Sequence, residues 1–210
     1  MKTDKITVTN SGQGMAEAIE QAAASAAYRG LTGKDAVHLR LLSEEMLGML
    51  RQIAGETEAV FWVESEGKRF QLHLAAHPCL TGRMRRDLLS VSSSGKNAAA
   101  VGIMGKLRDI FERAFDATPA DDSVKYFRQG VVFPVEMGEI DLAAFAATGS
   151  VLSWSMQKYR DCVESEKAED SEAKEEWDEL EKSIVANIAD EITVAIRGSE
   201  VEMTIYKQFN

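Results

Sequence analysis

A glycine-led segment in the middle of the chain contains residue types that bind anions. Residues 92–97 (SSSGKN) come directly before an apolar helical stripe and would form a helix N-terminus. Free backbone N–H groups and the positive end of the helix dipole favour an anion there. The plainer interpretation is a capped helix after a solvated loop, and binding of a phosphate or another anion is the alternative. The candidate phosphate-binding residues are Ser94, Gly95, Lys96 and Asn97, with Arg85 and Arg86 from the preceding loop.

Two carboxylates lie among apolar neighbours in an earlier segment, residues 41–50 (LLSEEMLGML). Glu44 precedes Gly48 by four residues, so both positions share one stripe of a helix. A solvated helix edge is the plainer interpretation of Glu44 and Glu45. A carboxylate that acts on a bound ligand is the sharper one.

Two histidines and a cysteine share one face of a predicted strand. His73, His77 and Cys79 alternate along it, and imidazole and thiolate groups are zinc ligands. However, His73 and His77 lie four strand residues apart, about 13 Å, whereas zinc ligands stand about 2.0–2.3 Å from one metal ion. We therefore predict no metal site, and nothing in the sequence resembles a nucleophile elbow.

Apolar periodicity places these residues on elements. Helical spacing is clearest in residues 34–54, which end at Gly55. Residues 59–64 and 69–74 alternate as two strands around a turn, which predicts a hairpin. The other predicted elements are a strand at 5–9, a small-residue helix with Met15 and Ala26, a helix ending near Phe115, an edge strand at 130–135, a helical stripe from Asp141 through Leu152 to Val163, a helix with Trp177 and Ile188, and a last hairpin at 191–206.

The order of these elements predicts the fold class. Because most strands come in hairpins, the sheet should be mixed or largely antiparallel, with helices over one face. We predict an α/β (α+β) two-layer sandwich forming a single domain over residues 1–210. Residues 116–189 are an inserted or diverged, mainly helical part in this prediction.

The charge is acidic overall and unevenly distributed. A net charge of −10 argues against general nucleic-acid binding. Residues 161–182 hold eleven acids against three lysines, whereas residues 81–115 hold seven basic side chains against three acids. The acidic run is expected to be a solvated helical surface, with docking of a basic partner as the alternative. The apolar runs are too short to span a membrane and the two cysteines lack zinc or redox spacing, so we expect a cytoplasmic protein without a membrane partner.

The helix around Glu44, followed by a hairpin, a basic loop, a glycine-led helix and a last hairpin, resembles the histidine-kinase-like ATPase family. The chain is most similar to the anti-sigma-factor and serine-protein kinase branch, over about residues 5–115 and 190–208. The family has a Glu that activates or orients water or a hydroxyl group, and an Asn one turn later that helps to hold magnesium. The resemblance implies that Glu44 is the catalytic base. It places Gly48, which has no side-chain oxygen, at the Asn position.

Two further family motifs concern the nucleotide. An Asp followed by glycines binds the adenine amino group, but here His77 lies nearest to that place and only Gly82 remains. The third motif corresponds to residues 92–97, and the resemblance implies that Lys96, Arg85 and Arg86 reach the phosphates. ATP is therefore the implied cofactor, with magnesium held by phosphates and water alone.

Three hypotheses about function remain open. In the leading one, the chain is a regulatory protein that kept the fold and binds a protein partner, a sigma factor or another regulator, with weak or no nucleotide turnover. In the second, it is a working ATP-binding serine-protein kinase or ATPase with drifted motifs. In the third, it is an unrelated α/β scaffold protein, which a backbone without helix 34–54 packed on the sheet would favour. The apolar face of the N-terminal helix is compatible with a homodimer.

Overall fold

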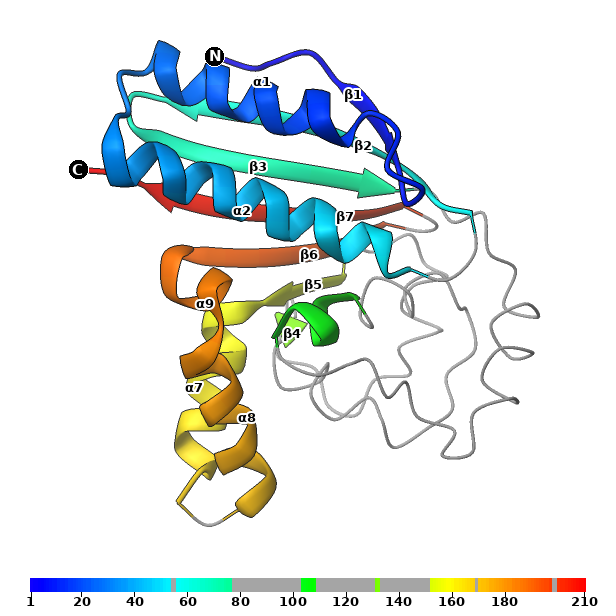
Figure 1. The fold of residues 1–210 in the computed structure, drawn as a ribbon. Helices are drawn as coiled ribbons and strands as arrows, with labels where there is room; N and C mark the ends of the chain where they lie inside the picture. Colours follow the sequence, from blue (N-terminus) through cyan, green and yellow to red (C-terminus); the bar gives the residue numbers. More distant parts are fainter. Residues whose placement is uncertain (54–55, 77–102, 109–130, 133–151, 169, 198–199) are drawn as a thin grey trace.

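One antiparallel sheet of seven strands organises the molecule, in the spatial order β1-β2-β3-β7-β6-β5-β4 (Figure 1). The computed structural model describes residues 1–53, 56–76, 103–108, 131–132, 152–168, 170–197 and 200–210. All strand pairs within these ranges are antiparallel. The strands are β1 (Ile6–Thr9), β2 (Glu58–Glu66), β3 (Arg69–Ala76), β4 (Val131–Val132), β5 (Leu152–Ser155), β6 (Glu191–Arg197) and β7 (Glu200–Gln208).

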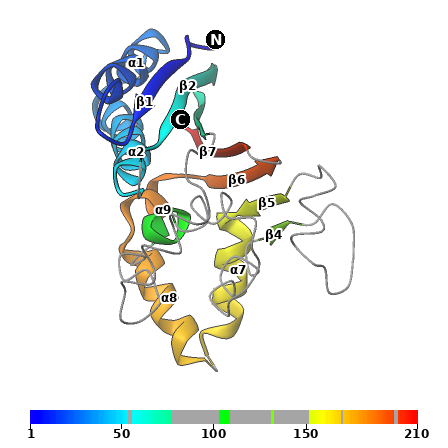
Figure 2. The same cartoon turned by 90° about the vertical axis from the view of Figure 1, so that its right-hand side faces the viewer.

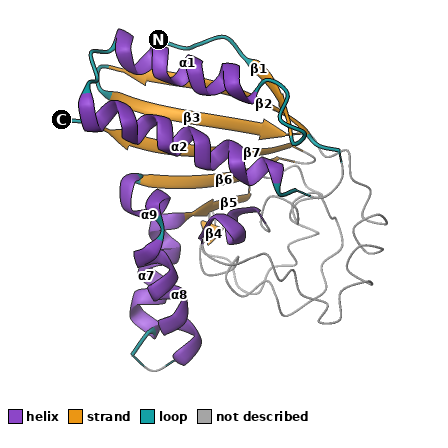
Figure 3. Ribbon diagram, viewed as in Figure 1, coloured by secondary structure: helices purple, strands orange, loops and turns teal. Residues whose placement is uncertain are grey.

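Two helices, α1 (Met15–Tyr28) and α2 (Gly33–Arg51), form a layer over one face of this sheet (Figure 3). The predicted two-layer sandwich is therefore confirmed, as are the strand at 5–9, the helix at 34–54 and both hairpins. The turn of the first hairpin contains Gly67 at φ +58°, a backbone conformation that favours glycine. The buried alanines of α1, which are Ala18, Ala22 and Ala26, pack in the core of the same chain. This apolar face, which we considered for a homodimer, is thus already covered.

The predicted helical stripe from Asp141 to Val163 is wrong at residues 152–155, and its part before Leu152 lies outside the described residues. Residues 152–155 form β5, which pairs with β6, and helix α7 begins only at Met156. Ser155 fixes this boundary, because its hydroxyl accepts a hydrogen bond from the backbone N–H of Lys158 at 3.2 Å and donates one to Glu191 at 2.8 Å.

Two helices of the predicted insertion form an arm that projects from the sheet (Figure 2). α7 (Met156–Glu166) and α8 (Ser171–Lys182) lie side by side, and the short helix α9 (Ile184–Ile188) returns the chain to the sheet beside α2. We call α7 and α8 the helical arm. Trp154 of β5 and Tyr159 of α7 are buried at the base of this arm, with ring centroids 5.8 Å apart.

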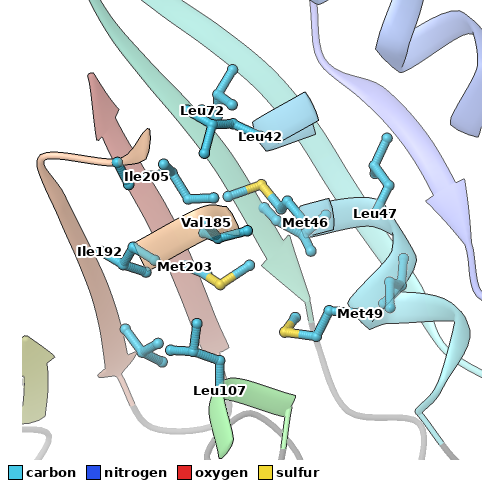
Figure 4. Packing of buried hydrophobic residues seen from close by; sticks show 14 of the residues in the cluster. Leu42, Met46, Leu47, Met49, Leu72, Leu107, Val185, Ile192, Met203 and Ile205 are labelled. Carbon is cyan, nitrogen blue, oxygen red and sulfur yellow. The ribbon is translucent and has the colours of Figure 1, made fainter. Parts of the chain in front are cut away.

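The core lies between α2 and the sheet (Figure 4). Leu42 and Met46 come from α2, Leu72 and Met203 from the sheet, and Leu107 from a helical segment at residues 103–108. Full burial of one such side chain contributes about 1.5–3 kcal/mol. This packing fixes the rotation of α2 and therefore determines which of its polar side chains face outward.

Candidate functional site

Glu44, the predicted catalytic base, lies on the outer side of α2. Its carboxylate Oε1 accepts a hydrogen bond from Arg40 Nε at 2.8 Å, and the two side chains are 38% and 59% exposed. The two residues are four positions apart on the helix, an arrangement that contributes about 0.3–0.5 kcal/mol at a solvated surface. The structure thus places Glu44 in a surface ion pair, as the plainer interpretation expected.

Gly48, one turn after Glu44, has open space above it. A Cβ atom built on this residue would meet no atom of another element within 4 Å. The packing around α2 therefore does not require a glycine at position 48. A larger side chain fits, and an asparagine would present an oxygen one turn from Glu44.

The neighbouring acid, Glu45, lines a pocket of about 360 Å³. The pocket lies between α2, the start of segment 103–108, the end of α8 and the beginning of α9. The pocket is lined by the carboxylates of Glu45 and Glu179, the ammonium group of Lys182 and mainly apolar side chains. The lining residues include Glu45, Ile103, Met104, Glu179, Lys182 and Val185.

Segment 103–108 is joined to the helical arm through a buried lysine. The Lys106 ammonium donates a hydrogen bond to the Tyr159 hydroxyl at 2.8 Å and lies 3.1 Å from a carboxylate oxygen of Glu176 and 3.6 Å from one of Glu179. Lys106 is 9% exposed, so this contact is shielded from solvent. The solvated surface predicted for residues 161–182 is therefore only partly correct, because two of its acids face inward and neutralise Lys106.

Burial, followed by the charge of Glu176, raises the pKa of the Tyr159 hydroxyl well above its ordinary value of 10.0. Tyr159 should therefore stay protonated in the folded chain, whereas in the unfolded chain it ionises near pH 10. Below pH 10, this difference leaves the free energy of unfolding unchanged. Above pH 10, ionisation of Tyr159 in the unfolded chain lowers the free energy of unfolding by about 1.4 kcal/mol per pH unit. In an absorbance titration at alkaline pH, we expect Tyr159 to ionise only together with unfolding. Tyr159→Phe should remove that amplitude, and ionisation of Tyr159 in the folded protein would contradict this account.

The sheet face opposite α1 and α2 contains a second polar cluster, around His73. The imidazole stacks on Trp62, with ring centroids 4.6 Å apart, and its Nδ1 lies 2.8 Å from Glu202 Oε1. A hydrogen bond from Lys2, followed by one from Trp62, lowers the pKa of Glu64 beside this stack. Within the described ranges, no group of three or more His, Cys, Asp or Glu side chains could hold a metal ion. His77 and Cys79 lie outside those ranges.

The predicted phosphate-binding residues also lie outside the described residues, so the structure does not bring them together with Glu44. They are Arg85, Arg86, Ser94, Gly95, Lys96 and Asn97.

Sequence reasoning missed the Lys106 cluster altogether. A weak signal was present, because Lys106 stands between the apolar Met104 and Leu107, and Glu176 and Glu179 lie three residues apart on one helical face. A lysine on an apolar face, with paired acids on another helix, indicates a buried ion pair only once the two segments are known to pack together.

No protein-family model, no curated protein and no solved structure matches this chain. In the part of the chain that the structure describes, no helix combines the length and the apolar character needed to cross a membrane. The class that the structure defines is an α/β sandwich with an antiparallel sheet, two covering helices and a projecting helical arm.

Proposed function

We propose that this chain is a regulatory protein of the histidine-kinase-like ATPase type that acts by binding a protein partner, as anti-sigma factors do. Nucleotide is held weakly or not at all, with weak or no turnover. The order β1, α1, α2, β2–β3 hairpin and β6–β7 hairpin supports the resemblance on which this proposal rests.

The arrangement of Glu44 and Gly48 is the observation behind the absence of turnover. Glu44 is ion-paired with Arg40 on the outer side of α2, and Gly48 offers no oxygen where a magnesium ligand would be needed. A base without a positioned metal loses the charge stabilisation on which phosphoryl transfer depends. Binding is thus the activity that this arrangement supports best.

The outer surface of the helical arm supports a protein partner. Asp161, Glu164, Glu175 and Asp178 are exposed on it. An acidic surface on a projecting element speeds association with a basic surface of a second protein. The partner we propose is a protein with a basic docking face, a sigma factor or another regulator.

The second candidate is a working ATP-binding serine-protein kinase or ATPase. The pocket beside Glu45 favours it, because a cavity of about 360 Å³ adjoins the helix on which the family places its catalytic carboxylate. The third candidate, an unrelated scaffold, receives no such support, since α2 does pack on the sheet.

Calorimetric titration with ATP and ADP, with and without magnesium, separates the first two candidates. We expect no magnesium-dependent binding and no release of phosphate. Micromolar binding that requires magnesium, together with turnover abolished in Glu44→Gln, would establish the ATPase candidate instead. Glu17→Gln, an exposed acid on α1, is the matched control for loss of one negative charge.

A further inference from the structure

Arg108 is a buried arginine whose guanidinium group is only partly used. The residue is 3% exposed, and its Nη1 donates one hydrogen bond, of 2.9 Å, to Gln52 Oε1 at the end of α2. Its Nε and Nη2 atoms are buried without a hydrogen-bond acceptor. Among the described residues, no carboxylate lies within ion-pair distance of this guanidinium.

The two unused nitrogens lie on the same edge of the guanidinium plane. Nε–H and the adjacent N–H of Nη2 point the same way, and this edge is one of those that hold two oxygens of a single oxyanion by parallel hydrogen bonds. The bond to Gln52 uses the other terminal nitrogen and holds the plane in place. The unused part of Arg108 therefore has the shape of a complete bidentate oxyanion site.

Arg108 differs from the other buried cation of the same segment. Lys106 is accompanied by Glu176 and Glu179, whereas Arg108 has no counter-charge in the described part of the chain. A guanidinium cannot lose its proton in a protein, so it cannot avoid the cost of burial by becoming neutral. A buried, unpaired charge costs several kcal/mol. A bound anion would remove much of that cost.

We propose that the Nε–Nη2 edge of Arg108 binds a phosphate group, either free phosphate or the phosphate of a small molecule. Phosphate presents two oxygens to the Nε–Nη2 edge and carries up to two negative charges. Both properties suit a buried guanidinium without a counter-charge among the described residues. Gln52, the residue that holds Arg108 through Nη1, is exposed at the end of α2. The proposal does not depend on the family resemblance, because it requires neither Glu44 nor nucleotide turnover.

The test compares wild-type protein with Arg108→Met and with Arg51→Met, which removes an exposed arginine of α2 and so controls for loss of charge. Binding of inorganic phosphate is followed by ³¹P NMR and by thermal unfolding, at an ionic strength held constant with chloride. At a phosphate concentration ten times its dissociation constant, we expect the wild-type midpoint to rise by about 3–6 °C. Arg51→Met should keep this shift, and Arg108→Met should lose it.

Two further results strengthen the test. In chloride alone, Arg108→Met should unfold at or above the wild-type temperature, because it removes an uncompensated buried charge. If Arg108→Met does not fold, Arg108→Lys keeps the charge without the fork and should lose most of the shift. ATP in place of phosphate shows whether the site prefers a nucleotide. If phosphate raises the unfolding midpoint equally in all variants, or does not raise it in the wild-type protein, the proposal is wrong. Buried water would then be the partner of Arg108.

Discussion

We expect Lys106→Met to lower the free energy of unfolding by about 3 kcal/mol, the largest loss of stability among the variants considered. The substitution removes the ammonium that lies 3.1 Å from Glu176 and 3.6 Å from Glu179. It also removes the donor to the Tyr159 hydroxyl. The mostly buried carboxylate of Glu176 and the partly exposed carboxylate of Glu179 would then lose their counter-charge. Urea unfolding at pH 7 measures the change as a shift of the midpoint.

Lys174→Met is the matched control, since Lys174 is an exposed lysine of α8 and its replacement should change stability by less than about 0.5 kcal/mol. Glu176→Gln added to Lys106→Met should restore part of the loss, because one uncompensated charge disappears with it. Equal midpoints for Lys106→Met and Lys174→Met would show that the cluster is solvated and does not hold the helical arm to segment 103–108.

Local patterns were sufficient for the elements that form the sandwich. In α2, Leu39, Leu42, Met46 and Leu50 all face the core, as their helical spacing predicts. The β2–β3 hairpin has an alternating pattern on both sides of Gly67, whose positive φ the turn requires. In both cases the signal is local, because periodicity and turn chemistry act over a few neighbouring residues.

The error at β5 has a different cause. Leu152, Met156, Tyr159 and Val163 are spaced by three or four residues, so the pattern predicts that residues 152–155 belong to the same helix as Met156. Pairing with β6, forty residues later in the chain, decides that residues 152–155 are a strand. A local pattern does not contain that partner, although Ser155 was available as an N-cap signal.

Long-range packing also decides which acid of α2 faces the pocket. Glu44 and Glu45 are adjacent in sequence but about 100° apart around the helix. The position of α9 beside α2 makes Glu45 a pocket residue and leaves Glu44 with Arg40. The same holds for Lys106, whose partners in α8 are some seventy residues away along the chain.

Gly48→Asn should make nucleotide binding depend on magnesium. The open space above Gly48 accepts the larger side chain, and the asparagine oxygen would then lie one turn from Glu44. Amide and carboxylate oxygens are ligands for magnesium together with phosphate oxygens. We expect ATP to bind at least about tenfold more tightly with magnesium than without it in this variant, a gain of about 1.4 kcal/mol. The wild-type protein should show no difference between its affinity for ATP with magnesium and its affinity without magnesium.

Gly48→Ala separates this effect from a change in the helix itself. Alanine should stabilise α2 by about 1 kcal/mol, and asparagine by only a few tenths, because both replace a glycine inside a helix. Only asparagine supplies an oxygen, so only Gly48→Asn should respond to magnesium in calorimetric titration. If both variants bind ATP as wild type does, with or without magnesium, position 48 does not correspond to the magnesium ligand of the histidine-kinase-like ATPases. The assignment of Glu44 and Gly48 to that family's catalytic and metal-binding positions would then be wrong, whereas the proposed phosphate site at Arg108 would be unaffected.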